Sequence, residues 1–308
     1  MLTRRTLFSN MVGTGLALAA KVERSGAQTG RRRMIVDAQV HLWKAESEDW
    51  RWVPGAVPQL PEPFTIEKLV PLMDEAGVDR AVIVPPGWPG DRNDYGLEAA
   101  KRYPDRFAVM GRIPLRDPRS AALLPKWKEQ PNMLGVRVAF LNNAADWISD
   151  GTADWFWPAA EKASVPVMAY APGRAPLFAA IAERHPGLNL IIDHMNVSAQ
   201  MARDNQLANG IDQTVALAKY PNVSVKVSSS PGLSFEPYPF RDVAVHLRRV
   251  IEAFTPQRAF WGTDLTNSYS KATYRQRVTH FTETLQFLNA DELDLIMGRA
   301  ILARLGWS

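Results

Sequence analysis

The stretch "MIVDAQVHLW", residues 34–43, begins as an apolar run and ends in polar and aromatic side chains. Alternate residues of a β-strand point to the same face of the sheet. Strict alternation would therefore place four chemically different side chains together, namely Asp37, Gln39, His41 and Trp43. An acid, an amide, an imidazole and an indole on one face of a buried strand predict one wall of a pocket.

Seven further short apolar runs follow, and amphipathic segments lie between them. Several runs are continuous and rich in Val and Ile, as expected for parallel strands that are covered on both faces. The predicted strands after 34–43 are 80–86, 106–113, 133–140, 166–171, 189–195, 222–229 and 259–265. Eight strands that alternate with helices predict an α/β fold of the (β/α)8 type, the TIM barrel.

The first amphipathic segment, "TIEKLVPLMDEAG", begins at Thr65, a candidate N-cap, and ends at Gly77, a candidate C-cap. A doubly wound open sheet is the alternative fold, but no G-x-G-x-x-G motif follows a strand and there is no P-loop. We therefore expect a single catalytic barrel domain over residues 31–308. The loop 44–63 is long and rich in Trp and Pro, which is typical of a lid or a binding segment.

Residues 1–30 have the features of an export signal. Arg4 and Arg5 precede an apolar stretch, and a small-residue site follows at 25–27. This pattern resembles a twin-arginine signal and predicts a periplasmic protein. The apolar stretch is too short to span a bilayer, so we expect no membrane association once the signal is removed. The alternative is a disordered basic tail on a cytoplasmic protein.

The composition excludes several classes of function. The formal charge of the 308 residues is +4, but arginines crowd the N-terminal segment and the remainder is close to neutral. We therefore expect no nucleic-acid partner. The chain has no cysteine, which excludes disulfides, thiolate metal sites and a cysteine nucleophile. The sequence leaves the oligomeric state open, and a homo-oligomer is compatible with it.

Ionisable side chains accumulate where the predicted strands end, and barrel enzymes carry their chemistry at these ends. Buried without partners, such groups would each cost several kcal/mol, so they must pair with one another or with a ligand. An arginine in such a pocket matches a carboxylate or sulfonate with two hydrogen bonds. The candidate substrate-binding residues are Arg137, Arg112, Lys226, Tyr170, Trp43 and Gln39. For Lys226 we expect a substrate carboxylate or Asp264 as the partner.

Three motifs carry a resemblance to a known family. "VDAQVHLW" resembles the Asp-x-His-x-His opening of the amidohydrolase superfamily, and "LIIDHMN" and "WGTDL" resemble its later His and its final-strand Asp. With "GVRV" and "VKVSS", the ordered set is similar to the branch that contains 2-pyrone-4,6-dicarboxylate lactonase, sugar lactonases and sulfomuconolactone hydrolases. The resemblance covers nearly all of residues 34–308.

The resemblance implies a hydrolase that opens a small, anionic lactone. In this interpretation Asp264 activates water as a general base, while His194 and His41 polarise the ring carbonyl. A metal-dependent decarboxylase of an aromatic or related acid is one alternative. A non-catalytic barrel that binds a small molecule is another.

The sequence alone does not decide whether the protein binds a metal ion. Gln39 stands where the resembled motif has its first His, and no lysine ends the fourth strand, so a binuclear centre is not expected. The groups His41, His194 and Asp264 could hold a single divalent ion such as zinc, with Gln39 as a weak fourth ligand. The resembled branch also has members that need no metal, so a metal-free site and a site with one divalent ion are both compatible with the sequence.

Other residues have simpler interpretations. Asp264 could instead be the N-cap of the helix that follows it. Asp37 is expected to be structural, either orienting His41 or holding a loop in place. His246 and His280 fall on predicted outer helices, where we expect surface roles.

Overall fold

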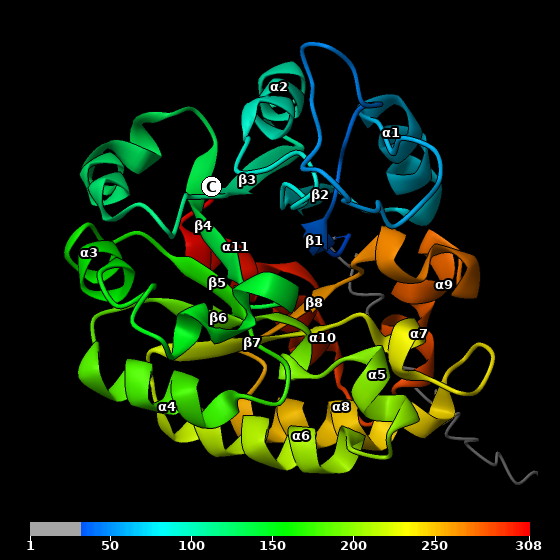
Figure 1. Cartoon of the computed structure of the whole chain (residues 1–308). Coiled ribbons are helices and arrows are strands. Elements are labelled where there is room, and N and C mark those ends of the chain that lie inside the picture. The colour runs from blue at the N-terminus through cyan, green and yellow to red at the C-terminus, as the bar shows by residue number, and fades with distance from the viewer. Residues whose placement is uncertain (1–31) are drawn as a thin grey trace, which may run out of the picture. The chain divides into compact units, whose positions relative to one another are not determined.

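Eight parallel strands form one sheet in chain order, β1 to β8, and every sequential pair is parallel (Figure 1). The computed structural model describes residues 32–308; the predicted export signal lies outside the described residues. The strands are β1 Val36–Val40, β2 Arg80–Ile83, β3 Phe107–Gly111, β4 Met133–Ala139, β5 Val167–Tyr170, β6 Leu190–Ile192, β7 Val223–Ser228 and β8 Ala259–Gly262. The fold is the expected α/β (β/α)8 barrel, and each observed strand lies within its predicted run.

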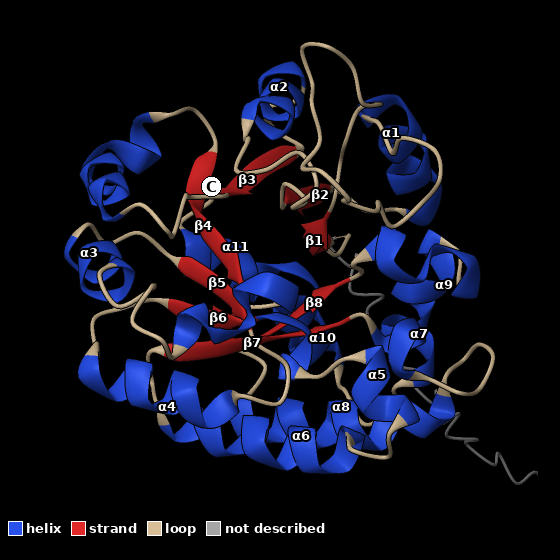
Figure 2. Cartoon of the chain, in the orientation of Figure 1, coloured by secondary structure: helices blue, strands red, loops and turns tan. Residues whose placement is uncertain are grey.

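Helices surround the strands on the outside of the barrel (Figure 2). The α-helices are α1 Ile66–Ala76, α2 Asp94–Arg102, α3 Phe156–Lys162, α4 Ala175–Arg184, α5 Ala199–Arg203, α6 Leu207–Val215, α7 Ser230–Leu233, α8 Arg241–Phe254, α9 Tyr274–Thr279, α10 Ala290–Asp294 and α11 Ala300–Leu305. Short 3₁₀ segments cover Pro118–Glu129, Asn142–Ile148, Asp193–Asn196, Ala216–Lys219 and Leu265–Lys271. Two π-helical turns cover His280–Thr284 and Leu295–Arg299.

The first helix ends as its sequence predicts. Gly77 follows α1 with φ 75°, a left-handed conformation that glycine adopts without a steric penalty. Thr65 occupies the N-cap position with extended backbone, but its side chain makes no capping hydrogen bond. The helix boundary is therefore set mainly by the apolar face, on which Ile66, Leu69 and Met73 are buried.

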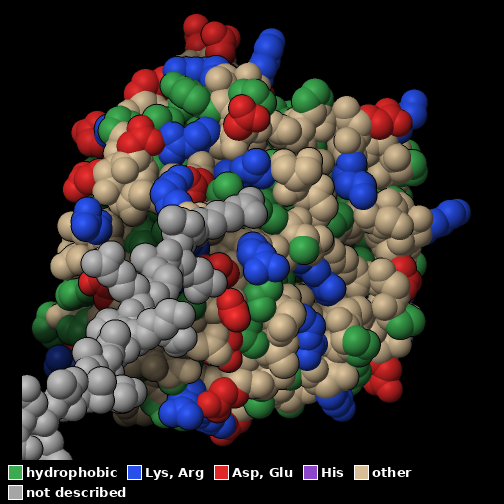
Figure 3. All heavy atoms as spheres, turned by 180° about the vertical axis from the view of Figure 1, so that it is seen from behind, with side chains coloured by type: hydrophobic (Ala, Val, Ile, Leu, Met, Phe, Trp, Pro, Cys, Tyr) green, Lys and Arg blue, Asp and Glu red, His purple; other side chains and the backbone are tan. Residues whose placement is uncertain are grey.

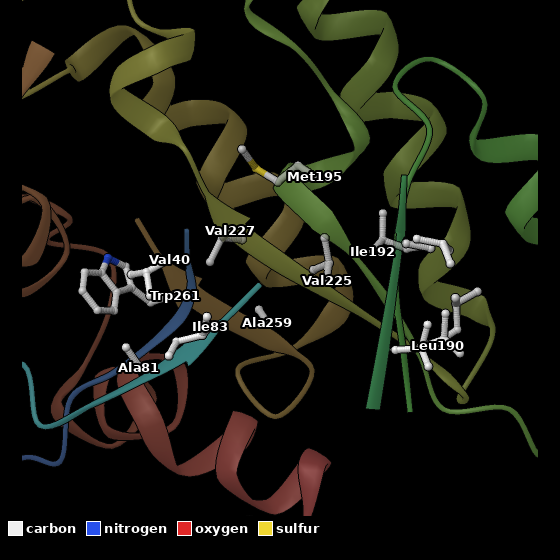
Figure 4. Close-up of a cluster of buried hydrophobic side chains, with 14 of the residues drawn as sticks. Val40, Ala81, Ile83, Leu190, Ile192, Met195, Val225, Val227, Ala259 and Trp261 are labelled. Carbon is white, nitrogen blue, oxygen red and sulfur yellow. The ribbon is translucent and has the colours of Figure 1, made fainter. Parts of the chain in front are cut away.

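Apolar side chains fill the barrel interior at the amino ends of the strands. Met110, Met168, Ile191 and Phe260 belong to one buried cluster with Ile301 of α11, which packs beneath the barrel. A second cluster lies between the strands and the surrounding helices, and Figure 4 shows part of it, including Val225, Val227 and Trp261. Fully burying one such side chain stabilises the fold by about 1.5–3 kcal/mol.

The strict alternation expected along β1 is wrong for Asp37. The register of β1 against β2 shifts between Asp37 and Val40, which breaks the alternation of faces. The Asp37 carboxylate instead accepts hydrogen bonds from the Thr263 N–H at 2.8 Å and the Tyr274 hydroxyl at 2.7 Å. These bonds join β1 to the end of β8 and to α9. Asp37 therefore holds the barrel closed and does not orient His41.

Trp43 is also misplaced by the sequence analysis. Its side chain is fully buried and packs against Phe64 and Trp88, with ring centroids 6.0 Å and 5.0 Å away. Trp43 is thus part of the apolar core, because the chain beyond β1 turns towards α1 and no longer follows the strand.

His280 does not lie at the surface. It is 1 % exposed, and its ring packs edge-on against Phe240 and Phe281 at centroid distances of 5.5 Å and 5.4 Å. Phe240, in the segment that leads into α8, covers the side of the π-helical turn on which His280 lies. The local periodicity of the sequence gives no information about this contact.

Figure 3 shows the face of the molecule opposite to the one seen in Figure 1. On the face seen in Figure 3, basic and acidic side chains are interspersed. No helix within the described residues is both long enough and apolar enough to cross a bilayer.

Candidate active site

A cavity of about 1020 Å³ opens where the carboxyl ends of the strands meet. Most of the residues singled out from the sequence line it, namely Gln39, His41, Arg112, Arg137, Tyr170, His194 and Asp264. They come from six different strands or from the turns that follow them. Two of the candidates, Trp43 and Lys226, do not line the cavity.

The loop 44–63 forms part of the cavity wall. Val53, Ala56, Val57 and Gln59 line the cavity from this loop, and Val57 is 83 % exposed. The loop therefore covers one side of the opening, as its length and composition predict. Trp88, from the loop after β2, supplies the indole that the sequence analysis assigned to Trp43.

Asp264 lies between two imidazoles. Its Oδ1 is 3.0 Å from His41 Nε2, and its Oδ2 is 3.6 Å from His194 Nε2. The Ser229 hydroxyl donates to Oδ2 at 3.3 Å. Although close to His41, Oδ1 makes no aligned hydrogen bond within residues 32–308. One oxygen of a buried carboxylate is therefore free to accept a proton from a water molecule in the cavity.

Left-handed backbone conformations aim these side chains into the cavity. Asp264 has φ 48°, His194 has φ 52° and Ser229 has φ 65°. Each such residue other than glycine costs about 1–3 kcal/mol, and such residues cluster at functional sites. The Asp264 side chain makes no capping hydrogen bond to the 3₁₀ segment that follows it. This geometry does not support the alternative role of Asp264 as a helix N-cap.

Each imidazole is oriented through its second ring nitrogen. His41 Nδ1 lies 2.7 Å from the Val84 carbonyl oxygen, and because a carbonyl only accepts, Nδ1 carries a proton there. His194 Nδ1 lies 2.8 Å from the Ser228 hydroxyl. Both rings therefore present Nε2 to Asp264 and to the cavity.

Burial alone would raise the pKa of Asp264. The neighbouring imidazoles of His194 and His41 and the guanidinium of Arg137 outweigh burial and hold the pKa of Asp264 well below its usual value. Burial lowers the pKa of His194, although Asp264 opposes this shift. The free site therefore carries an ionised Asp264 at neutral pH.

A second polar layer lies beneath the cavity. Lys226 is fully buried, and its Nζ is 2.8 Å from Asp193 Oδ1 and 2.7 Å from Gln39 Oε1. Arg137 Nε donates to the other Asp193 oxygen at 3.0 Å. Lys226 does not line the cavity, and Asp193 and Gln39 are its partners in place of the expected substrate carboxylate or Asp264. Asp193, to which the sequence analysis gave no role, organises this layer.

The two cavity arginines differ in their pairing. Arg137 donates to Asp193 through Nε and lines the cavity. Arg112 Nε is 3.4 Å from Asp91 Oδ1. Burial lowers the pKa of Arg112, and the neighbouring charge of Arg137 lowers it further, although Asp91 opposes both. Two like charges at one wall favour an anionic or oxygen-rich ligand between them.

Tyr170 does not offer its hydroxyl to a ligand. The hydroxyl donates to the Val197 carbonyl at 2.8 Å, and the ring meets His194 edge-on with centroids 5.1 Å apart. Burial raises the pKa of Tyr170, and Asp264 adds to this. Tyr170 therefore packs His194 in place and lines the cavity with its ring.

Sequence reasoning assigned no role to two serines that act on the central groups. Ser228 orients His194, and Ser229 donates to Asp264. The repeated serines of "KVSSS" at the end of β7 are the available signal, since hydroxyls after a buried strand need partners. The local sequence does not indicate which polar group each serine contacts.

The residues present do not fit a resident metal. His41, His194 and Asp264 have suitable chemistry, but no three His, Cys, Asp or Glu side chains in the described part of the chain are grouped so that they could hold one. Gln39 Nε2 lies 3.1 Å from His194 Nε2 and 3.4 Å from His41 Nε2. An amide N–H only donates, so it occupies the His194 Nε2 lone pair that a metal would need.

A (β/α)8 barrel with ionisable groups gathered at the carboxyl ends of its strands is the arrangement of barrel enzymes. Residues 36–303 match the family model described as amidohydrolase, and the chain belongs to this family. A curated relative, the L-fucono-1,5-lactonase of Burkholderia ambifaria, is 30% identical over 242 residues, which are 74% of this chain and 79% of the relative.

Solved structures share the fold. An amidohydrolase of Burkholderia multivorans with bound zinc has a TM-score of 0.74 at 20% identity and covers 89% of this chain and 99% of its own. A protein of Acinetobacter baumannii, named as a probable 2-pyrone-4,6-dicarboxylic acid hydrolase and solved with citric acid, has a TM-score of 0.69 at 20% identity with the same coverage. At this identity, both comparisons support the barrel fold alone.

Proposed function

We propose that this protein is a hydrolase that opens a small lactone ring. The observation that carries the proposal is the Asp264 carboxylate, buried between two imidazoles at the floor of the cavity, with one oxygen free of an aligned hydrogen bond. The 30% identity to an L-fucono-1,5-lactonase supports the same reaction class.

The reaction begins when a water molecule hydrogen-bonds to Asp264 Oδ1. Asp264 takes one proton as the water oxygen bonds to the ring carbonyl carbon, and the carbonyl oxygen becomes an oxyanion. General-base catalysis of this kind contributes about 10²–10⁴ in rate. A carboxylate with a strongly lowered pKa is a weak base, so substrate binding must first remove part of its stabilisation. A doubly protonated His41 does this, because its Nε2–H, which faces Asp264 Oδ1 at 3.0 Å, can turn to the substrate carbonyl and leave the carboxylate.

The tetrahedral intermediate collapses when the bond from the carbonyl carbon to the ring oxygen breaks. Asp264, now a carboxylic acid, returns its proton to the leaving oxygen, and a hydroxy acid is formed. Gln39 and His41 line the cavity, where the Gln39 amide N–H and the Nε2–H of a doubly protonated His41 can donate to the oxyanion. Each turnover releases one proton to the solvent, since the new carboxylic acid ionises at neutral pH.

The arginines suggest which lactones fit. Arg137 and Arg112 share a wall of the cavity, so we propose a substrate that places a carboxylate, a sulfonate or an oxygen-rich edge against them. Such contacts orient the carbonyl towards Asp264. A carboxylated pyrone, a sulfonated muconolactone and a sugar lactone all meet this requirement.

A lactone panel tests the proposal. Purified protein is assayed by proton release with L-fucono-1,5-lactone, 2-pyrone-4,6-dicarboxylate and an unsubstituted δ-lactone, each with and without a chelator, and the Asp264→Asn variant is the matched control. We expect at least one substituted lactone to be opened equally fast in both conditions. No turnover of any lactone would overturn the proposal in favour of a binding protein, and chelator-sensitive release of carbon dioxide from an aromatic acid would favour a decarboxylase.

A further inference from the structure

The polar layer beneath the cavity connects a buried ammonium to both imidazoles. Lys226, Asp193 and Gln39 are all 0 % exposed. Lys226 Nζ bridges Asp193 Oδ1 and Gln39 Oε1, and Gln39 Nε2 in turn approaches His194 Nε2 and His41 Nε2. These three side chains have no exposed surface, so their hydrogen bonds depend on the protein groups around them.

The ammonium decides which way the Gln39 amide points. An ammonium has three donors and no acceptor, so the Gln39 atom 2.7 Å from Lys226 must be the carbonyl oxygen. If the amide were turned over, two donors would face each other in a dry interior. The –NH₂ group of Gln39 is therefore directed at the imidazoles.

This orientation sets the tautomer of His194. Its Nε2 accepts the Gln39 N–H at 3.1 Å, so the ring proton resides on Nδ1 and is donated to Ser228. In the amide orientation that would suit a metal, Oε1 would face the imidazoles and the –NH₂ group would face the ammonium of Lys226. Lys226 prevents that orientation.

We propose that Lys226 is a positioning residue, which locks the Gln39 amide so that His194 is held as its Nδ1–H tautomer and the imidazoles are withheld from a metal ion. The alternative is that Lys226 serves only as an ion-pair partner of Asp193. The proposal deepens the proposed function, because the tautomer leaves Nε2 facing the cavity, but its tests use no lactone.

Two substitutions separate these roles. Lys226→Met removes the ammonium, whereas Gln39→Met removes the amide and leaves the ion pair of Lys226 with Asp193 in place. Histidine is rare in this chain, with five residues, so ¹⁵N side-chain spectra of histidine-labelled protein can be assigned by single replacements. We expect both variants to lose the Nδ1–H signature of His194. If Lys226→Met does not fold, Gln39→Met still tests the tautomer.

Zinc binding supplies the second measurement. Zinc chloride is titrated into wild type, Lys226→Met and Arg137→Met, the last of which removes a neighbouring positive charge without touching Gln39. We expect zinc to bind Lys226→Met at least about tenfold more tightly than either of the others, a size typical of groups that orient metal ligands. In the Gln39→Met background, Lys226→Met should have little further effect.

Two results would overturn the proposal. One is an unchanged Nδ1–H tautomer of His194 in Gln39→Met. The other is equal tightening of zinc binding by Lys226→Met and Arg137→Met, which would mean that charge alone controls the metal. If neither result appears but no lactone is opened, the positioning role stands and the lactonase proposal fails.

Discussion

The two halves of the barrel interior are built from the same strands but contain opposite chemistry. Near the amino ends the inward side chains are apolar, as with Ile191 and Phe260. Two to four residues further along the same chain segments, the inward side chains are Asp193 and Asp264, which belong to the polar layers. The amino end of a strand can therefore contribute to the apolar core, while the carboxyl end of the same strand carries ionised groups. The cost of burying charge is confined to the end where a ligand can use it.

The largest expected effect is at the polar end. Asp264→Asn keeps the size of the side chain but removes the proton acceptor, so kcat for lactone opening should fall by about 10³ or more. The free energy of unfolding, measured in urea, should also fall, because the lowered pKa of Asp264 means that the folded state stabilises its ionised carboxylate. Activity within tenfold of wild type would show that the base is another group.

A substitution at the apolar end should mainly lower stability and should leave catalysis nearly unchanged. Phe260→Ala, four residues before Asp264, should lower the free energy of unfolding by about 4 kcal/mol, because it opens a cavity in a fully buried cluster. The kcat of the folded fraction should stay within a few-fold of wild type. Phe260→Leu is the matched control and should lose much less stability. A variant that keeps its stability but loses catalysis would mean that the two halves are not separable.

A smaller effect is expected outside the barrel, at His280. Burial lowers its pKa to about 4, well below the value of about 6.5 in an unfolded chain. Between these two values the unfolded state binds a proton that the folded state does not. Stability therefore falls as the pH drops from about 6.5 to about 4, by about 3 kcal/mol from this residue.

Urea unfolding of wild type and His280→Phe at pH 7 and pH 4 measures this contribution. The two proteins should differ by about 3 kcal/mol more at pH 4 than at pH 7, in favour of the variant. Parallel pH dependence of the two proteins would mean that His280 is protonated inside the fold. This contrast would also show that pH acts on the outer core independently of the active site.

The order of the strands could be predicted because it depends on local patterns. Continuous Val- and Ile-rich runs, and helices that end at residues such as Gly77, need only short-range information. For the same reason the positions of His41, His194 and Asp264 after their strands could be predicted, since polar residues interrupt apolar runs there. The family resemblance rests on the same motifs.

What the sequence alone determined is thus which residues are placed at the carboxyl end of the barrel. Only the tertiary structure decided which of them touch. Lys226 pairs with Asp193 and Gln39, Asp37 joins β1 to β8, and Trp43 and His280 are buried in apolar surroundings. These outcomes depend on the register between strands and on what packs over each helix. Such contacts join residues tens to hundreds of positions apart, and no local pattern encodes them.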